Sequence, residues 1–161
     1  MALHSVHVAK ADPEKFEEYK LIFDGSSLIR HYGDNVYEWM KTALDADEAY
    51  IAEDRNGETV GFMWMQIPSM YADQPYLALL GVRNDYRAHG VGQLLIQFFI
   101  NVYERAGYER GLIAVNDFNP RARILYEDMG FHKFIQYPES LNPGNNVYLL
   151  MRKTKKFNSN V

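Results

Sequence analysis

The chain has 161 residues, of which 47% are hydrophobic and 14% aromatic, and its formal charge is -4 at pH 7. This length and apolar content suffice for a substantial core, so we expect a single domain over residues 1–153 and a disordered tail over residues 154–161. The net negative charge gives no general attraction to nucleic acid or to an anionic membrane. The absence of cysteine excludes disulfides, thiolate metal sites and a cysteine acyl-enzyme. With neither a secretory signal nor an apolar run near ~20 residues, the sequence predicts a cytoplasmic protein without a membrane partner.

The first half of the chain carries strand and helix patterns in turn. Asp12 and Pro13 supply a cap and a first-position proline for a helix. Apolar residues on both faces of the hairpin's second arm place that arm inside the sheet. The expected elements are a strand over residues 5–10, a helix up to a break at 24–27, a second helix around 36–43, and a hairpin of strands over 49–52 and 59–67.

The second half predicts two parallel strands joined by a helix. A continuous apolar strand is followed by a helix of about four turns and then by another short buried strand, and this succession favours a right-handed crossover. The expected elements are strands over 76–82 and 112–115, a helix ending near Gly107, a helix from Asn119 to Gly130, and closing strands over 132–137 and 146–153.

A short turn after the strand over residues 76–82 has the composition of a phosphate-binding loop. Its residues are Arg87, Ala88, His89, Gly90, Val91 and Gly92. Backbone N–H groups converge where a strand, a turn and a helix meet, and the helix dipole adds partial positive charge. Gly90 and Gly92 have no Cβ that would hold a pyrophosphate away from these amides. The alternative is that both are turn glycines without a ligand. The sequence lacks the spacing of a dinucleotide fingerprint and the Gly-Lys-Ser/Thr of a P-loop.

A second landmark follows one strand later, where Asn119 and Pro120 open a helix that contains Tyr126 and stops before Gly130-Phe131. Together with the turn, which has the pattern Arg-x-x-Gly-x-Gly, the stretch over residues 76–131 resembles the GCN5-related N-acetyltransferase (GNAT) family. The resemblance implies an α/β fold with a mixed, mostly antiparallel sheet that splays between two central parallel strands and is flanked by helices. It also implies acyl transfer from coenzyme A to an amine.

The resemblance assigns the binding of acetyl-CoA to these two landmarks. It implies that backbone N–H groups from Arg87 through Gly92 hold the pyrophosphate, and that the strand edge at Leu80 and Val82 binds the pantetheine. The N–H group of Leu80 is then the donor that polarises the thioester carbonyl. Asn119 would contact the cofactor, and Tyr126 would protonate the leaving thiolate. No metal is implied, and without a cysteine the amine is expected to attack directly in a ternary complex.

The group that takes the proton from the amine stays open. Some members of the family carry a glutamate at the position of Tyr76, so a direct carboxylate base is not indicated there. The candidates, as bases or as holders of a water chain, are Asp73, Tyr76, Tyr71, His31 and Glu38.

Several of these side chains also have a purely structural interpretation. Tyr126 fits equally well as a buried core aromatic, and His89 as a solvated loop residue. Two further sets share this ambiguity. The first set is aromatic and either lines an acceptor pocket or packs in the core: Trp39, Tyr71 and Trp64. The second set is cationic and either meets the ribose phosphate of the cofactor or faces solvent: Arg121 and Arg123.

The sequence as a whole predicts an N-acetyltransferase that moves an acetyl group from acetyl-CoA to a primary amine of a small molecule or peptide. Two alternatives stay open. One is a sensor module that binds CoA or acyl-CoA with little or no catalysis, and the other is a protein acetyltransferase acting on a lysine or an N-terminus. The expected partner is the amine acceptor, with a homodimer as a further option.

Overall fold

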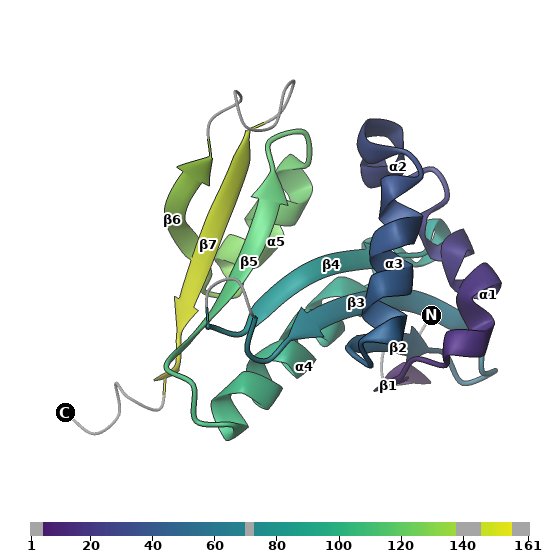
Figure 1. Cartoon of the computed structure of the whole chain (residues 1–161), viewed down its shortest axis with the longest axis horizontal. Helices are drawn as coiled ribbons and strands as arrows, with labels where there is room; N and C mark the ends of the chain where they lie inside the picture. Colours follow the sequence, from purple (N-terminus) through teal and green to yellow (C-terminus); the bar gives the residue numbers. More distant parts are fainter. Residues whose placement is uncertain (1–4, 70–72, 138–145, 156–161) are drawn as a thin grey trace. The chain divides into compact units, whose positions relative to one another are not determined.

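The computed structural model describes residues 5–69, 73–137 and 146–155. Its strands are β1 (His7–Lys10), β2 (Ala49–Glu53), β3 (Thr59–Gln66), β4 (Tyr76–Val82), β5 (Arg110–Asn116), β6 (His132–Tyr137) and β7 (Val147–Lys153). The helices are α1 (Phe16–Lys20), α2 (Ser27–Tyr32), α3 (Asn35–Asp45), α4 (Val91–Arg105) and α5 (Pro120–Asp128), with short 3-10 helices η2 (Pro13–Lys15), η3 (Leu21–Phe23) and η4 (Asn84–Tyr86). The described strands form one sheet in the order β1-β2-β3-β4-β5-β7-β6 (Figure 1).

The strand pairing confirms the mixed, mostly antiparallel sheet that the sequence predicts. β4 and β5 run parallel, with Tyr76 opposite Leu112 and Leu77 opposite Ile113. The pairs β1–β2, β2–β3, β5–β7 and β6–β7 are antiparallel. β4 is the middle strand in the sheet order, and α4 forms the crossover to β5. The expected central strand and its parallel partner are therefore both present.

The internal contacts of the chain divide it into two compact units, which are described separately. The first unit contains residues 1–65 and 79–98, and the second contains residues 66–78 and 99–161. Both β4 and α4 contribute residues to each unit. The expectation of one domain over residues 1–153 stays a prediction.

The core of the first unit forms because the apolar residues of α3 recur at helical spacing. Val36, Met40 and Ala43 lie on one face of this helix and are fully buried. They share a cluster with Phe23 of η3 and Phe62 of β3, whose rings lie 6.1 Å apart edge to face. Burying a large apolar side chain of this kind stabilises the fold by about 2 kcal/mol.

In the second unit, the end of α4 contacts β7 through the buried guanidinium of Arg152. Arg152 Nη1 donates to the Tyr103 hydroxyl at 2.7 Å and to Glu104 Oε2 at 2.8 Å. Arg152 is 7% exposed, and Tyr103 is fully buried against Phe99, with the two rings 5.1 Å apart. A buried charge needs such partners, so this contact fixes how the end of α4 packs on β7.

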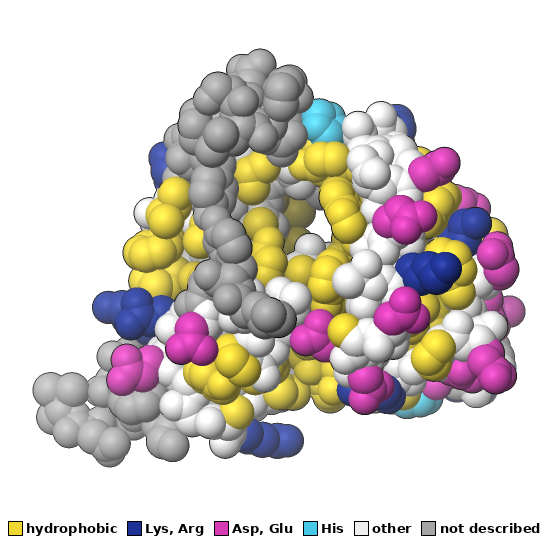
Figure 2. Space-filling model, viewed as in Figure 1, with side chains coloured by type: hydrophobic (Ala, Val, Ile, Leu, Met, Phe, Trp, Pro, Cys, Tyr) yellow, Lys and Arg dark blue, Asp and Glu magenta, His cyan; other side chains and the backbone are white. Residues whose placement is uncertain are grey.

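The surface of the second unit carries exposed apolar side chains. Ile124 of α5 is 59% exposed, and Phe134 and Ile135 of β6 are 52% and 40% exposed. β6 is an edge strand of the sheet. Figure 2 shows hydrophobic side chains gathered at the surface on the β6 side of this unit.

Some element boundaries differ from those expected from the sequence. The helix expected around residues 36–43 is α3, and the structure adds the separate helix α2, which ends where Gly33, at φ 60°, donates its N–H to the Ile29 carbonyl at 2.8 Å. Thr154, expected in the tail, is buried, and its hydroxyl donates to the Tyr108 carbonyl at 2.7 Å. Tyr71, the loop over residues 138–145 and the tail from residue 156 lie outside the described residues.

Candidate functional site

The turn before α4 has the backbone shape of an anion-binding loop. Ala88 and Gly90 both adopt left-handed conformations, with φ of 65° and 85°. The first intrahelical bond of α4 runs from the Leu94 N–H to the Gly90 carbonyl at 3.0 Å, and the helix starts at Val91. The N–H groups of its first turn, which include those of Val91 and Gly92, therefore have no acceptor within the helix itself. These groups are available to an anion at the positive end of the helix dipole.

Ala88 is an unusual residue for this position. A left-handed conformation costs an L-residue other than glycine about 1 to 2 kcal/mol, because Cβ crowds the following carbonyl. Such strain persists where the surrounding structure fixes the backbone, and it is concentrated at ligand sites. Ala88 and His89 are both exposed, so the cost is not offset by burial of their side chains.

Arg87 holds the turn through contacts within its own loop. Its Nε donates to the Val82 carbonyl at 3.0 Å, its Nη1 to Asn84 Oδ1 at 3.0 Å, and its backbone N–H to the Asn84 carbonyl at 3.4 Å. Burial, followed by the nearby positive charge of Arg30, lowers the pKa of Arg87. Arg30 thus adds a second positive charge near the first residue of the turn. The expected donation of the Arg87 N–H to a pyrophosphate stays a prediction and competes with the bond to Asn84.

Leu80 and Val82 lie on β4 ahead of the turn, and both are half-buried. The residues of β4 that pair with β5 are Tyr76 and Leu77, which lie earlier in the strand. The roles expected for Leu80 and Val82 in holding a pantetheine and polarising a thioester therefore stay predictions.

Asn119 caps α5, as its sequence position predicts. Its Oδ1 accepts the Ala122 N–H at 3.2 Å, Pro120 occupies the first turn, and Gly130 follows the helix at φ 98°. The cap uses Oδ1, so a contact with a cofactor would come from the Nδ2 amide. That contact stays a prediction.

Tyr126 lies on α5 and is 7% exposed. Burial is the main cause that raises the pKa of its phenol above the usual value, and the neighbouring Tyr76 adds to it. The phenol therefore keeps its proton at every pH near neutrality. This environment suits a hydrogen-bond donor better than a base, and both expected interpretations of Tyr126, core aromatic and donor to sulfur, are compatible with it.

The candidate bases do not gather in one unit. His31 and Glu38 are exposed residues of α2 and α3 in the first unit, where the His31 ring packs edge to face on Tyr32 at 4.6 Å. Asp73 and Tyr76 belong to the second unit, and Asp73 is exposed. Among the described candidates, Tyr76 is the one whose charge acts on Tyr126.

The remaining ambiguous side chains have structural partners. Trp39 packs edge to face on Tyr32 at 5.0 Å, and Trp64 Nε1 donates to Glu48 at 3.1 Å; both also pack against the core of the first unit. Arg123 lies 4.4 Å from the ring of Tyr148 and pairs with Glu127, whereas Arg121 is exposed. These contacts favour packing for the two tryptophans.

The described residues contain no group of three or more His, Cys, Asp or Glu side chains placed to hold a metal ion. They also contain no helix with the length and apolar character needed to cross a bilayer.

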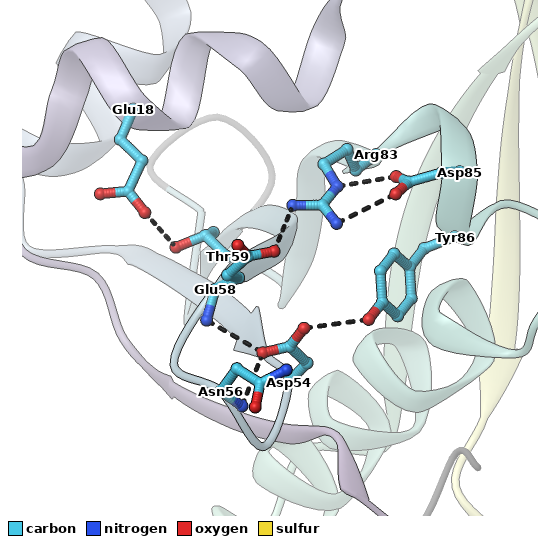
Figure 3. A network of polar contacts seen from close by, with 8 residues as sticks. All are labelled: Glu18, Asp54, Asn56, Glu58, Thr59, Arg83, Asp85 and Tyr86. Carbon is cyan, nitrogen blue, oxygen red and sulfur yellow. Dashed lines mark hydrogen bonds and ion pairs between the residues drawn. The ribbon is translucent and has the colours of Figure 1, made fainter. Parts of the chain in front are cut away.

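The sequence interpretation missed a polar network that leads into the turn (Figure 3). Asp54, in the β2–β3 turn, accepts the Tyr86 hydroxyl at 3.0 Å, and Arg83 joins Glu58 at 3.3 Å to Asp85 at 2.7 Å. Asp54 and Tyr86 are 32 residues apart in the sequence, and no local signal marks their contact.

A mixed sheet with a parallel central pair, a turn with left-handed residues at the start of the crossover helix and a buried phenol on the next helix are the features that the sequence resemblance predicts for the α/β fold. The model of the Acetyltransferase (GNAT) family matches residues 13–131, and the chain belongs to that family. The matched residues include both landmarks, which confirms the resemblance.

Curated relatives of known activity share part of this chain. Mycothiol acetyltransferase of Beutenbergia cavernae is 31% identical over 81 residues, which are 50% of this chain and 27% of that protein. N-alpha-acetyltransferase 30 of Saccharomyces cerevisiae is 29% identical over 82 residues, which are 50% of this chain and 47% of that protein. The chain thus spans less than half the length of these relatives.

A solved structure extends the likeness in fold over nearly the whole chain. A chain in the crystal structure of the NatC complex bound to Gag peptide and CoA has a TM-score of 0.72 and 21% identity, with coverage of 92% of this chain and 98% of that chain. At this identity the likeness is one of fold.

Proposed function

We propose that this protein transfers an acetyl group from acetyl-CoA to a primary amine. The observation that carries the proposal is the turn before α4, where left-handed Ala88 and Gly90 precede a helix N-terminus in a chain of the GNAT family. Successive N–H groups at such a terminus bind phosphate oxygens, and acetyl-CoA presents a pyrophosphate. The positive charge of Arg30 near Arg87 supports the same ligand chemistry.

In this proposal the donor is held through backbone groups. The N–H groups of Val91 and Gly92 donate to the pyrophosphate, while Ala88, His89 and Gly90 shape the loop around it. The backbone of Leu80 and Val82 binds the pantetheine, and the Leu80 N–H donates to the thioester carbonyl oxygen.

Acetyl-CoA supplies the acetyl group in activated form, as a thioester. The amine nitrogen attacks the acetyl carbon directly, the carbon–sulfur bond breaks, and the amine gives up a proton. Tyr126 donates a hydrogen bond to the sulfur as negative charge develops there. Because burial raises the pKa of this phenol, complete transfer of its proton to a thiolate, with a pKa near ~8.5, is less favourable than for a free phenol.

The proton of the amine needs an acceptor, and Tyr76 is the described candidate beside Tyr126. A phenol is a poor base at neutral pH, so we assign Tyr76 to a chain of water molecules that carries the proton to solvent. Asp73, His31 and Glu38 stay alternatives.

The acceptor class favoured here is a peptide N-terminus. The yeast relative is an N-alpha-acetyltransferase, and the NatC neighbour holds a peptide together with CoA. A small amine is the second candidate, because another relative is a mycothiol acetyltransferase. A lysine side chain and a CoA sensor with little catalysis stay as alternatives, and the homodimer and the cytoplasmic location stay predictions.

The experiment is a panel of N-terminal peptides, lysine peptides with a blocked N-terminus, and small primary amines, each incubated with acetyl-CoA. We expect release of free thiol above the rate of background hydrolysis with a free N-terminus, and a product heavier by one acetyl group in mass spectrometry. Turnover with small amines alone would replace the peptide acceptor. Binding of CoA without turnover of any acceptor would favour the sensor.

A further inference from the structure

We propose that Tyr86 is a positioning residue for the acyl donor, because its hydroxyl, bonded to the buried carboxylate of Asp54, holds the phosphate turn in its binding shape. The proposal rests on the proposed function, since it concerns the same turn over residues 87–92. All the groups involved belong to the first unit.

Asp54 offers a rigid acceptor at the end of β2. It is 6% exposed, and its Oδ1 accepts the N–H groups of Asn56 at 2.9 Å and Glu58 at 3.0 Å, which closes the β2–β3 turn. Its Oδ2 faces the Tyr86 hydroxyl, which donates at 3.0 Å (Figure 3). These donors, the Glu58 N–H foremost, lower the pKa of Asp54, so the carboxylate stays charged and its acceptor strength is constant near neutral pH.

Tyr86 connects Asp54 to the turn directly, because it is the residue before the turn begins. It ends η4, is 7% exposed, and directly precedes Arg87. Its own N–H donates to the Arg83 carbonyl at 2.8 Å, and the Arg87 N–H donates to the Asn84 carbonyl at 3.4 Å. A shift of the Tyr86 ring therefore moves the first residue of the turn.

Arg83 makes a second, weaker contact between the β2–β3 turn and η4. Its guanidinium bridges Glu58 at 3.3 Å and Asp85 at 2.7 Å, and it lies 5.0 Å from the centre of the Tyr86 ring. The carboxylates of Glu58 and Asp85 are both 62% exposed. Ion pairs this exposed are screened by water and contribute little. The buried bond between Tyr86 and Asp54 is the stronger constraint.

The turn needs a constraint because its backbone is strained at Ala88, where φ is 65°. Without the Tyr86 hydroxyl, the loop relaxes part of the time into conformations whose N–H groups do not converge. A ligand then binds only the fraction of molecules in the competent shape, and its apparent affinity falls by that fraction. If about one molecule in ten stays competent, the affinity falls about tenfold.

The test is Tyr86→Phe, which removes the hydroxyl and keeps the ring. We expect the calorimetric Kd for CoA and the KM for acetyl-CoA to rise about tenfold, while kcat changes by less than about twofold. S-acetylpantetheine carries the thioester but no pyrophosphate. With the acceptor found in the panel, kcat/KM for S-acetylpantetheine should be equal in the wild type and the variant.

The matched control is Tyr19→Phe in the same unit. Tyr19 is 2% exposed and its hydroxyl accepts the Asp12 N–H at 2.9 Å, so this variant also loses one buried hydroxyl and one hydrogen bond. It should lower Tm without changing the Kd for CoA. Asp54→Asn should weaken CoA binding as Tyr86→Phe does, and the two changes together should not add. This variant also serves as the test if Tyr86→Phe does not fold.

An unchanged Kd for CoA in Tyr86→Phe, or an equal loss in Tyr19→Phe, overturns the positioning role. A loss that is as large with S-acetylpantetheine as with acetyl-CoA also overturns it. Failure of the wild-type protein to bind CoA is a different result, and it overturns the proposed function.

Discussion

Replacing Tyr126 by Phe should change how the stability of the protein depends on alkaline pH. In the unfolded chain this phenol ionises near its ordinary pKa of ~10, whereas burial raises the pKa in the folded state. Below pH ~10 both states keep the proton, and the contribution of the phenol to stability is constant. Above it the unfolded state loses the proton first, so the free energy of unfolding falls as the pH rises.

The size of this effect follows from linkage. With the folded phenol still protonated, ionisation of the unfolded phenol removes about 1.4 kcal/mol of stability between pH 8 and pH 11. The variant cannot contribute this loss, because the phenylalanine side chain does not ionise. The buried Tyr19 and Tyr103 titrate in both proteins and cancel in the comparison.

Urea unfolding of the wild type and Tyr126→Phe at both pH values measures the difference. We expect the stability advantage of the wild type to shrink by about 1.4 kcal/mol at the higher pH. A difference that does not change with pH would mean that Tyr126 is open to water and titrates normally, which refutes the burial argument.

In turnover, the same variant should lose about 100-fold or more in kcat with a smaller change in acetyl-CoA affinity if the phenol donates to the sulfur. Equal turnover would reduce Tyr126 to a packing residue.

Two further substitutions test the strain in the turn and the buried cation. Ala88→Gly removes a Cβ from a left-handed residue, and after the entropic cost of glycine we expect a gain of about 0.5 to 1 kcal/mol and a rise of about 2 °C in Tm; a fall in Tm would contradict the strained backbone. Arg152→Ala leaves Glu104 without its cation and Tyr103 without its donor, and we expect urea unfolding to show a loss of about 3 kcal/mol; a loss under about 1 kcal/mol would mean that the pair is solvated.

Much of the site could be predicted from the sequence where local chemistry decides the structure. Asn119, Pro120 and Gly130 mark the two ends of α5 because each suits one position of a helix terminus, and the structure has the cap and the left-handed stop. The parallel pairing of β4 and β5 followed from the length of the crossover.

Contacts between residues far apart in sequence could not be predicted in this way. Nothing in the residues near Tyr86 indicates that its hydroxyl meets Asp54. The left-handed backbone of Ala88 contradicts the local preference of alanine and depends on the surrounding structure. Likewise, the sequence predicted a role for the backbone N–H of Arg87 alone, and the hydrogen bonds of its side chain to Val82 and Asn84 were not predicted.

If the turn before α4 binds the pyrophosphate of acetyl-CoA, the substitution Gly92→Glu should abolish this binding. Gly92 lies in the first turn of α4, where a carboxylate interacts favourably with the helix dipole and helix propensity improves, so the variant should fold as stably as the wild type. Its negative charge would meet the phosphate oxygens. Gln97→Glu adds the same charge further along the same helix, at an exposed position, and is the control.

Calorimetric titration with acetyl-CoA should show binding to the wild type and to Gln97→Glu, and about 100-fold weaker binding or none to Gly92→Glu, at unchanged Tm. Equal affinity of Gly92→Glu and the wild type would mean that the turn does not hold the pyrophosphate.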